Sequence, residues 1–192
     1  MTRAEEEHEA LIDELQDMLK TSIQSKLPCF IRYPRGTGTG VKLKDSPEVI
    51  TVGNAEELNS GSDISIWALG NFVETATELA ERISINLGLS VSVVNARFVK
   101  PLDDELLLVH AKRHKMIVTL EDGVLKGGFG SSILESINDA CISTPIHRFG
   151  WPDEFIEHGD STDVLRKKHK LDTDSIFRSL EKTLKTQVET VL

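Results

Sequence analysis

The sequence predicts an α/β protein with a mostly parallel sheet that is covered by helices on both faces. From residue 64 onward, short apolar or β-branched runs alternate with stretches in which apolar residues recur every three or four positions. Such alternation requires right-handed crossover connections, which place helices on the two faces of a sheet. The composition agrees, because 39% hydrophobic and 28% charged residues in a chain of 192 are typical of a globular protein.

The first 45 residues are expected to contain one helix and one strand. Thr2 and Glu5 have the spacing of a capping box, and apolar residues follow at helical spacing as far as Ile23. The β-forming residues 29–33 lie between two prolines, which predicts a short strand. Residues 36–48 are rich in glycine, threonine and charge, as in a linker, so we expect a domain boundary between residues 1–45 and residues 46–192.

The second unit is expected to alternate strands and helices. Apolar and β-branched runs predict a short edge strand at 49–52 and strands at 64–69, 89–95, 116–120 and 146–149. Helical periodicity predicts helices at 72–87, 101–113, 131–140, 162–169 and 176–188. Gly88 supplies the left-handed residue that ends a helix, and Pro101 suits a first helical turn.

Charge and cysteine usage exclude several classes of protein. Lys+Arg number 22 and Asp+Glu number 31, for a net charge of −9, so no basic footprint for nucleic acid is expected. Cys29 and Cys141 lie far apart without Cys-x-x-Cys spacing, which encodes neither a disulfide framework nor a cysteine zinc site. The acidic N-terminus and the lack of a long apolar run argue against export and membrane insertion, so we expect a cytoplasmic protein.

Ligands of such sheets bind beyond the carboxyl ends of the strands, so the loops there are the candidate sites. Arg32, Tyr33 and Arg35 belong to the first of these loops, which Pro34 stiffens and Gly36 releases. A guanidinium held by a rigid turn is suited to a phosphate or a carboxylate ligand. The alternative is that both arginines form salt bridges with neighbouring carboxylates, and residue types alone leave both interpretations open.

Two further patterns have a structural and a functional interpretation. Gly127–Ser131 precedes a helix, so its free N–H groups are suited to an anion, or its glycines allow the helix to pack closely on a strand. It matches neither a Walker A loop nor GxGxxG. His110 and His114 have the spacing of two metal ligands, but no third ligand completes the set, and Lys112 and Arg113 indicate a solvated surface.

Four blocks carry a resemblance to a known family: PCFIRYPRGTGTGV, VVNARFVKPLDDELL, IVTLEDGVLKGGFGSSILE and GWPDEFIEHG. In this order they resemble the C-terminal part of the 1-deoxy-D-xylulose-5-phosphate synthase family, within the transketolase superfamily. The resemblance implies that residues 1–45 are the last helix and strand of a pyrimidine-binding domain. It implies that residues 46–192 form a transketolase-type C-terminal domain, whose largely parallel sheet has one antiparallel edge strand.

The resemblance also implies an activity. The family is a homodimeric transferase that joins pyruvate to glyceraldehyde 3-phosphate with loss of carbon dioxide, feeding isoprenoid, thiamine and pyridoxal synthesis. Its cofactors are thiamine diphosphate and a divalent metal such as Mg. The family's phosphate-binding arginine maps onto Arg35, whereas Arg32 and Tyr33 match the motif and are expected to shape the loop. Arg97–Asp103 and Gly150–Asp153 are expected to serve packing and dimer contacts.

The departures from the family lead to three hypotheses. The Gly-Asp-Gly motif that holds metal and diphosphate is absent: Glu121-Asp122-Gly123 is the nearest string, and Asn138 follows it too closely. The first hypothesis is therefore a C-terminal part of the synthase that is inactive alone, whose stray helix at 4–23 is mobile or packs on a second copy. The second is one half of a split thiamine-dependent enzyme, like the β-type subunits of 2-oxo acid dehydrogenases or two-part transketolases. The third is a non-catalytic dimerisation or regulatory domain.

Overall fold

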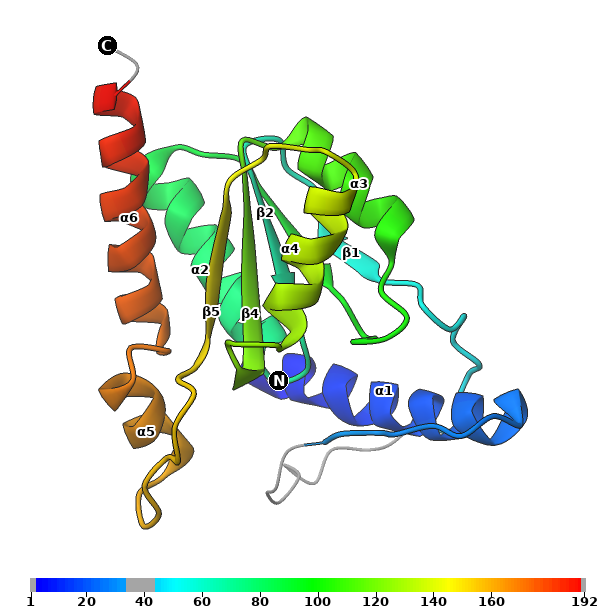
Figure 1. Ribbon diagram of the computed structural model, residues 1–192. Coiled ribbons are helices and arrows are strands. Elements are labelled where there is room, and N and C mark those ends of the chain that lie inside the picture. The colour runs from blue at the N-terminus through cyan, green and yellow to red at the C-terminus, as the bar shows by residue number, and fades with distance from the viewer. Residues whose placement is uncertain (1–2, 34–43, 191–192) are drawn as a thin grey trace.

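The computed structural model describes residues 3–33 and 44–190, and the side chains of residues 13–33 and 44–185. A five-stranded sheet lies at its centre, with helices on both faces (Figure 1). The strands are β1 (Glu56–Asn59), β2 (Ile64–Ala68), β3 (Val91–Asn95), β4 (Met116–Val124) and β5 (Ile146–Trp151). The helices are α1 (Arg3–Ser25), α2 (Phe72–Leu87), α3 (Asp104–Arg113), α4 (Phe129–Asp139), α5 (Thr162–Lys168) and α6 (Thr173–Thr190).

The sheet has the topology expected from the alternating pattern. Its strand order is β1-β3-β2-β4-β5, in which β2 to β5 pair in parallel and β1 pairs antiparallel with β3. All five residues of β2 are buried, and so are all five of β3. A parallel sheet covered on both faces needs such continuous apolar strands, because neither face meets water. The predicted fold class and its antiparallel edge strand are therefore confirmed.

Two hydrophobic cores fill the space between the sheet and its helices. One core joins Ile66 and neighbouring strand residues to α2 and α6, and contains Phe72 and Leu180. The other core joins the opposite face, including Trp67, to α3 and α4. Because successive strand residues point to opposite faces, adjacent residues of β2 serve different cores. Because β2 to β5 run parallel, their carboxyl ends all lie at one edge of the sheet.

Several predicted boundaries differ from the structure; among them, β4 and β5 end later than expected, at Val124 and Trp151, and α6 begins earlier, at Thr173. The edge strand is β1 at 56–59 and not 49–52. The backbone at 49–52 is engaged elsewhere, since the Ile50 N–H donates to Thr21 Oγ1 of α1 at 2.8 Å. Helix α3 begins three residues later than expected, because the Asp103 carboxylate caps it by accepting from the Leu106 N–H at 3.0 Å. Helix α4 begins two residues earlier than expected, at Phe129.

The strand expected at 29–33 does not form. Residues 28–33 follow α1 without regular structure, and Phe30 is fully exposed. A strand is stable only when a neighbour satisfies its backbone groups, and among the described residues no sheet edge pairs with this segment. Its β-forming side chains therefore have no pleated surface to pack on.

Helix α1 forms as predicted and lies below the sheet in Figure 1, against the linker that leads to β1. Asp13, Asp17 and Thr21 lie at intervals of four residues and accept hydrogen bonds from backbone N–H groups of that linker. The bonds are Lys44 N to Asp13 Oδ1 at 3.1 Å, Glu48 N to Asp17 Oδ1 at 2.6 Å and Ile50 N to Thr21 Oγ1 at 2.8 Å. The sequence pattern indicated only the apolar side of this helix, whereas its polar side makes these contacts.

Candidate functional site at the carboxyl edge of the sheet

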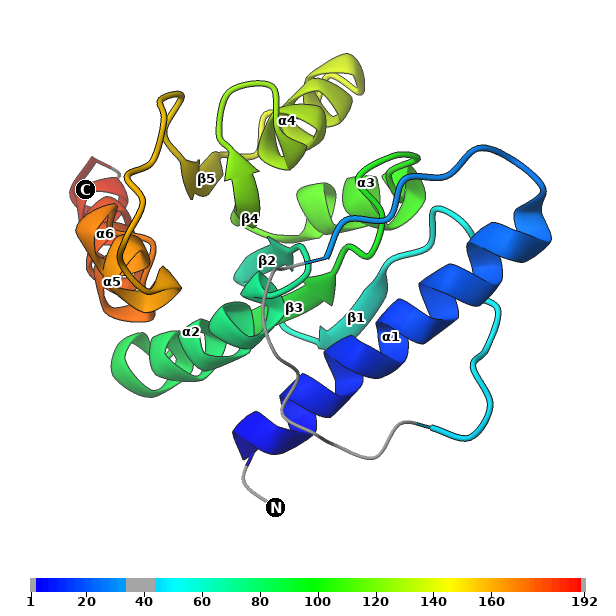
Figure 2. The same ribbon diagram turned by 90° about the horizontal axis from the view of Figure 1, so that it is seen from below.

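The carboxyl ends of β2, β3, β4 and β5 lie at the lower edge of the sheet in Figure 1. Helix α1 and the segment that follows it run across this edge, as the view from below shows (Figure 2). Asn71 and Arg97 follow β2 and β3, Glu121 and Asp122 lie in the last part of β4, and Trp151 ends β5. The edge therefore gathers charged and polar side chains from the loops that ligands use in such sheets.

A buried carboxylate organises the glycine-rich loop before α4. Glu121 is 2% exposed, and its two oxygens accept the N–H groups of Phe129 and Gly130 at 2.8 and 2.9 Å. Burial raises the pKa of Glu121, while these two hydrogen bonds and the nearby Arg148 and Arg32 act to lower it. The free N–H groups at this helix N-terminus thus hold an anion that belongs to the chain itself.

The glycines of this loop are required by close packing. A Cβ added at Gly128 would lie 2.2 Å from a Glu121 oxygen and 2.2 Å from the Val124 carbonyl oxygen. A Cβ at Gly130 would lie 2.6 Å from Thr119 Oγ1 of β4. The packing interpretation of Gly127–Ser131 is therefore confirmed, and the groups proposed for an external anion are occupied by Glu121.

Asp122 is the centre of a second set of contacts. Its carboxylate accepts the Trp151 indole N–H at 2.6 Å and the Asn71 amide at 3.3 Å. Its backbone carbonyl accepts a hydrogen bond from the Arg32 guanidinium. Asp122 thereby connects the ends of β2, β4 and β5 with the segment that follows α1. Among the described residues, no three His, Cys, Asp or Glu side chains are placed to share a metal ion.

The structure places two of the three predicted site residues. Arg32 is exposed and contacts the Asp122 carbonyl, and its charge acts on nearby Glu121. Tyr33 is 68% exposed. Arg35 lies outside the described residues. Among the described residues, Arg32 forms no salt bridge with a carboxylate, and its hydrogen-bond partner there is a main-chain oxygen.

Arg97, expected to serve packing or dimer contacts, binds one glutamate of α1 and one of β1. Its Nε donates to Glu14 Oε1 of α1 at 2.8 Å, and its Nη2 donates to Glu56 of β1. The Asn95 amide donates to the same Glu14 oxygen at 2.9 Å. These contacts join α1 to the sheet.

His110 of α3 and His114, which caps the C-terminus of that helix, are both buried, which corrects the expected solvated surface. His110 is 1% exposed and His114 is 4% exposed. Their rings stack with centroids 4.8 Å apart, and they reach Ser65 at 2.8 Å and Ser92 at 3.0 Å. A signal was available in the sequence, because Leu107, His110, Ala111 and His114 recur with the spacing of one helix face.

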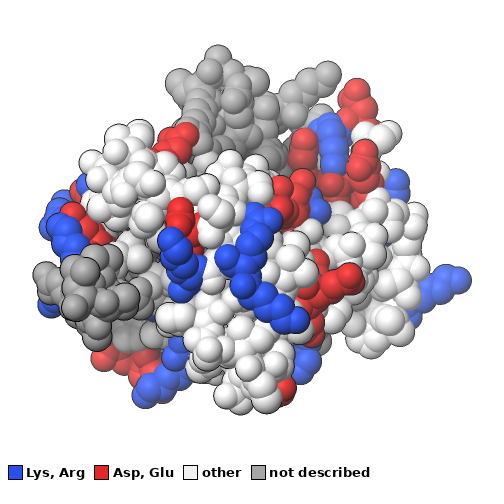
Figure 3. All heavy atoms as spheres, turned by 90° about the horizontal axis from the view of Figure 1, so that it is seen from above, with Lys and Arg blue, Asp and Glu red and all other residues white. Residues whose placement is uncertain are grey.

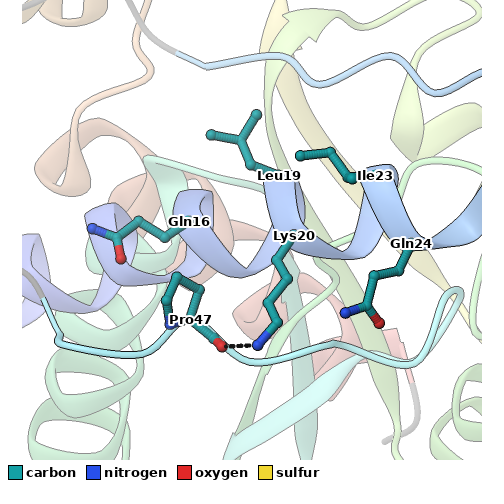
Figure 4. A pocket seen from close by; sticks show the side chains of 6 residues that line it. All are labelled: Gln16, Leu19, Lys20, Ile23, Gln24 and Pro47. Carbon is teal, nitrogen blue, oxygen red and sulfur yellow. Dashed lines mark hydrogen bonds between the residues drawn. The ribbon is translucent and has the colours of Figure 1, made fainter.

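A groove lies along the outer side of α1 (Figure 4). It has a volume of about 380 Å³ and is lined by Gln16, Leu19, Lys20, Ile23, Gln24 and Pro47. Lys20 closes one side by donating to the Pro47 carbonyl at 2.6 Å. Leu19 and Ile23, on the apolar side of this helix, are 48% and 77% exposed.

The face at the opposite edge of the sheet shows no continuous basic patch among the described residues; acidic and basic side chains are interspersed on it (Figure 3). The residues that are described also include no helix with the length and apolarity needed to span a membrane.

Comparisons with known proteins point to one family. The profile of the transketolase C-terminal domain matches residues 53–176. The 1-deoxy-D-xylulose-5-phosphate synthase of Methylacidiphilum infernorum is 45% identical over 173 residues, which cover 90% of this chain and 27% of that protein. The synthase of Acidobacterium capsulatum is 44% identical over 168 residues, 88% of this chain and 26% of that protein. The chain thus spans about a quarter of the length of these relatives.

Among solved structures, a split-gene transketolase, described as an inactive β4 tetramer, superposes with a TM-score of 0.65. It is 30% identical in sequence, and the match covers 77% of this chain and 48% of that one. The profile covers more than half of this chain, and the matched synthases align through their C-terminal part. The chain therefore belongs to the transketolase C-terminal domain family and corresponds to the C-terminal part of 1-deoxy-D-xylulose-5-phosphate synthases.

Proposed function

We propose that this chain contributes the C-terminal part of a 1-deoxy-D-xylulose-5-phosphate synthase, a transferase that joins pyruvate to glyceraldehyde 3-phosphate with decarboxylation. The observation that carries the proposal is the match to synthases over 90% of the chain at 45% identity. The proposal includes a homodimeric, cytoplasmic enzyme that feeds isoprenoid and thiamine synthesis. Within it, this chain binds substrate, and the rest of the synthase performs the carbon–carbon chemistry.

Arg35 is the proposed ligand of the sugar phosphate. A guanidinium is always charged and offers several donors in one plane, so it can orient a dianionic phosphate. Arg35 follows Arg32 by three residues, and Arg32 is bound to the Asp122 carbonyl at the carboxyl edge. Arg32 and Tyr33 shape the loop in this proposal, and the edge of the sheet supports it.

Thiamine diphosphate and Mg are proposed to bind outside this chain. The described residues do not fit them, because Glu121 and Asp122, the nearest match to the family's metal motif, are engaged by backbone N–H groups, Trp151 and Asn71. We therefore assign no step of the cofactor's chemistry to these residues. The chain alone is proposed to be inactive for this reason.

Residues 1–45 are proposed to complete the pyrimidine-binding domain, and residues 46–192 to form the C-terminal domain. Two observations support this division. The family profile begins at residue 53, beyond the proposed boundary. The apolar side of α1 and the segment after it are exposed, at Ile23, Leu27 and Phe30 among others. These side chains are proposed to pack on the part of the synthase that precedes them.

A second candidate is a thiamine-dependent enzyme made from two polypeptides. The structural match to a split-gene transketolase favours it specifically. In that case the complementing part is a separate subunit, and the same apolar surface on α1 binds it.

Reconstitution of activity tests the proposal. The chain is assayed with thiamine diphosphate, Mg²⁺, pyruvate and glyceraldehyde 3-phosphate, first alone and then joined to the preceding part of the Methylacidiphilum infernorum synthase. We expect product only from the joined protein. Arg35→Gln should then raise the KM for glyceraldehyde 3-phosphate roughly 10- to 100-fold, since a hydrogen bond to a charged group contributes about 1.5–3 kcal/mol.

The matched control is Arg82→Gln, which removes a half-buried arginine of α2 that pairs with Asp174 and lies over the Phe177 ring, and that contacts neither α1 nor the loops of the carboxyl edge among the described residues. It should leave both KM values unchanged. Turnover by the chain alone would refute the proposed division of labour. An unchanged KM in Arg35→Gln would refute the phosphate site.

A further inference from the structure

Residues 13–33 contact the C-terminal domain near both of their ends. Near the beginning, Glu14 of α1 meets Arg97, two residues beyond the end of β3. Near the end, Arg32 meets Asp122 of β4. Between the two contacts the chain crosses the carboxyl edge of the sheet (Figure 2). We call residues 13–33 the strap.

The first contact is a built cluster of charged groups. Arg97 Nε and the Asn95 amide both donate to Glu14 Oε1, at 2.8 and 2.9 Å, and the other side of the guanidinium binds Glu56. The side chains of Arg97 and Glu14 are only 22% and 16% exposed. Partial burial strengthens such charge-assisted hydrogen bonds relative to a solvated ion pair.

The backbone at Arg97 is adapted to this contact. Its φ is +55°, in the left-handed region that a residue with a bulky side chain rarely adopts. The Arg97 N–H donates to the Asn95 side-chain oxygen at 3.1 Å, which holds the turn. An unfavourable backbone conformation persists only when its surroundings enforce it, and it is often found at residues with a specific task.

The second contact rests on a fixed platform. The Asp122 carboxylate is held by Trp151 and Asn71, which belong to β5 and to the loop before α2. The adjacent Glu121 is buried against the N-terminus of α4. The carbonyl that Arg32 binds therefore cannot move without disturbing the loop before α2, the end of β5 and the loop before α4.

We propose that Arg97 and Arg32 are positioning residues that fasten the strap across the carboxyl edge and so hold the loop that begins at Arg32. The functional half of this inference rests on the proposed role of Arg35. Arg35 follows Arg32 by three residues in the sequence, and three residues of chain span at most roughly 11 Å. An arginine in a free segment would instead lose conformational entropy on every binding event.

Hydrogen exchange on the chain as it stands tests the fastening. Arg97→Gln should speed exchange in residues 13–25 at least tenfold and leave β2 unchanged. Glu14→Gln should have the same effect, and the double variant should add little, because both substitutions break one contact. Glu14 lies outside the domain core, so its variant tests the contact even if Arg97→Gln folds poorly. Arg32→Gln should speed exchange in residues 26–33, and Arg82→Gln should change neither segment.

The joined enzyme described above tests the positioning. Arg97→Gln and Arg32→Gln should each raise the KM for glyceraldehyde 3-phosphate about tenfold, with little change in the KM for pyruvate. Unaltered hydrogen exchange of α1 in both Arg97→Gln and Glu14→Gln overturns the fastening, whatever the activity of the joined enzyme. Faster exchange with an unchanged KM overturns the positioning role alone. If Arg35→Gln leaves the KM unchanged, the proposed phosphate site fails while the exchange result still decides the fastening.

Discussion

His110 should make the stability of this protein depend on pH between about 4 and 6.5. The ring is 1% exposed, contacts Ser65 at 2.8 Å and stacks on His114. Burial is the main cause that lowers its pKa from 6.5 to about 4, and the neighbouring His114 adds to the shift while Glu57 opposes it. The substitution that removes this titration is His110→Gln.

The sign and size follow from linkage. The unfolded chain takes up a proton near pH 6.5, whereas the folded chain resists protonation until about pH 4. Stability is therefore fully present above pH 6.5 and is lost as the pH falls toward the folded pKa. At pH 4.5 the two pKa values give a loss of about 2.5 kcal/mol relative to neutral pH. Burial also lowers the pKa of the half-buried His147, so this residue adds to the loss of stability at low pH.

Urea unfolding at pH 7.5 and pH 4.5 measures this effect. Carboxylates also titrate in this range, so the quantity to compare is the difference in unfolding free energy between wild type and His110→Gln at each pH. We expect this difference to fall by about 2.5 kcal/mol on acidification. The exposed His158 provides the control, since His158→Gln should leave the difference constant within about 0.5 kcal/mol. If the difference between wild type and His110→Gln is also the same at both pH values, burial does not lower the pKa of His110 and the reasoning is refuted.

Three further predictions concern the loop before α4 and the assembly. Gly128→Ala should lower the unfolding free energy by about 2–3 kcal/mol, because its Cβ would lie 2.2 Å from the Val124 carbonyl oxygen. Ser132→Ala is the control, and equal urea midpoints for Gly128→Ala and this control would contradict the close packing. Glu121→Gln should cost about 2 kcal/mol, since an amide has one acceptor oxygen for two N–H groups; thermal unfolding measures it, and an unchanged midpoint argues against the carboxylate's role. Sedimentation equilibrium should show a dimer, and a monomer at high concentration would refute that expectation.

The sequence predicted the elements whose signal is local. The apolar run at Ile64–Ala68 and the helical repeat from Phe72 to Leu87 appear where their patterns placed them. A continuous apolar run predicts a strand buried on both faces, and apolar residues every three or four positions predict a helix buried along one stripe. The strand predicted at 29–33 does not form, and the reason is non-local. A strand depends on a pairing partner that can be distant in the sequence. The edge strand was misplaced for the same reason.

The candidate site divides in a similar way. The family resemblance proposed Arg35, with Arg32 and Tyr33, as site residues, and of these Arg35 lies outside the described residues. The sequence did not identify Glu121 as the carboxylate held by the glycine-rich loop. Its two partners, Phe129 and Gly130, follow it by only eight and nine residues. Nor did it identify Arg97 as a contact to α1, since Glu14 is 83 residues away along the chain.

The order of residues alone determined the alternating α/β fold, the burial of its central strands and the resemblance of its loops to one family. Each depends on periodicity or on residues close together in the chain. Only the tertiary structure decided which carboxylate meets which guanidinium at the carboxyl edge, and that the polar side of α1 docks on the linker. Those pairings depend on where the parallel strands end in space, and no periodic pattern encodes the distance between two loops.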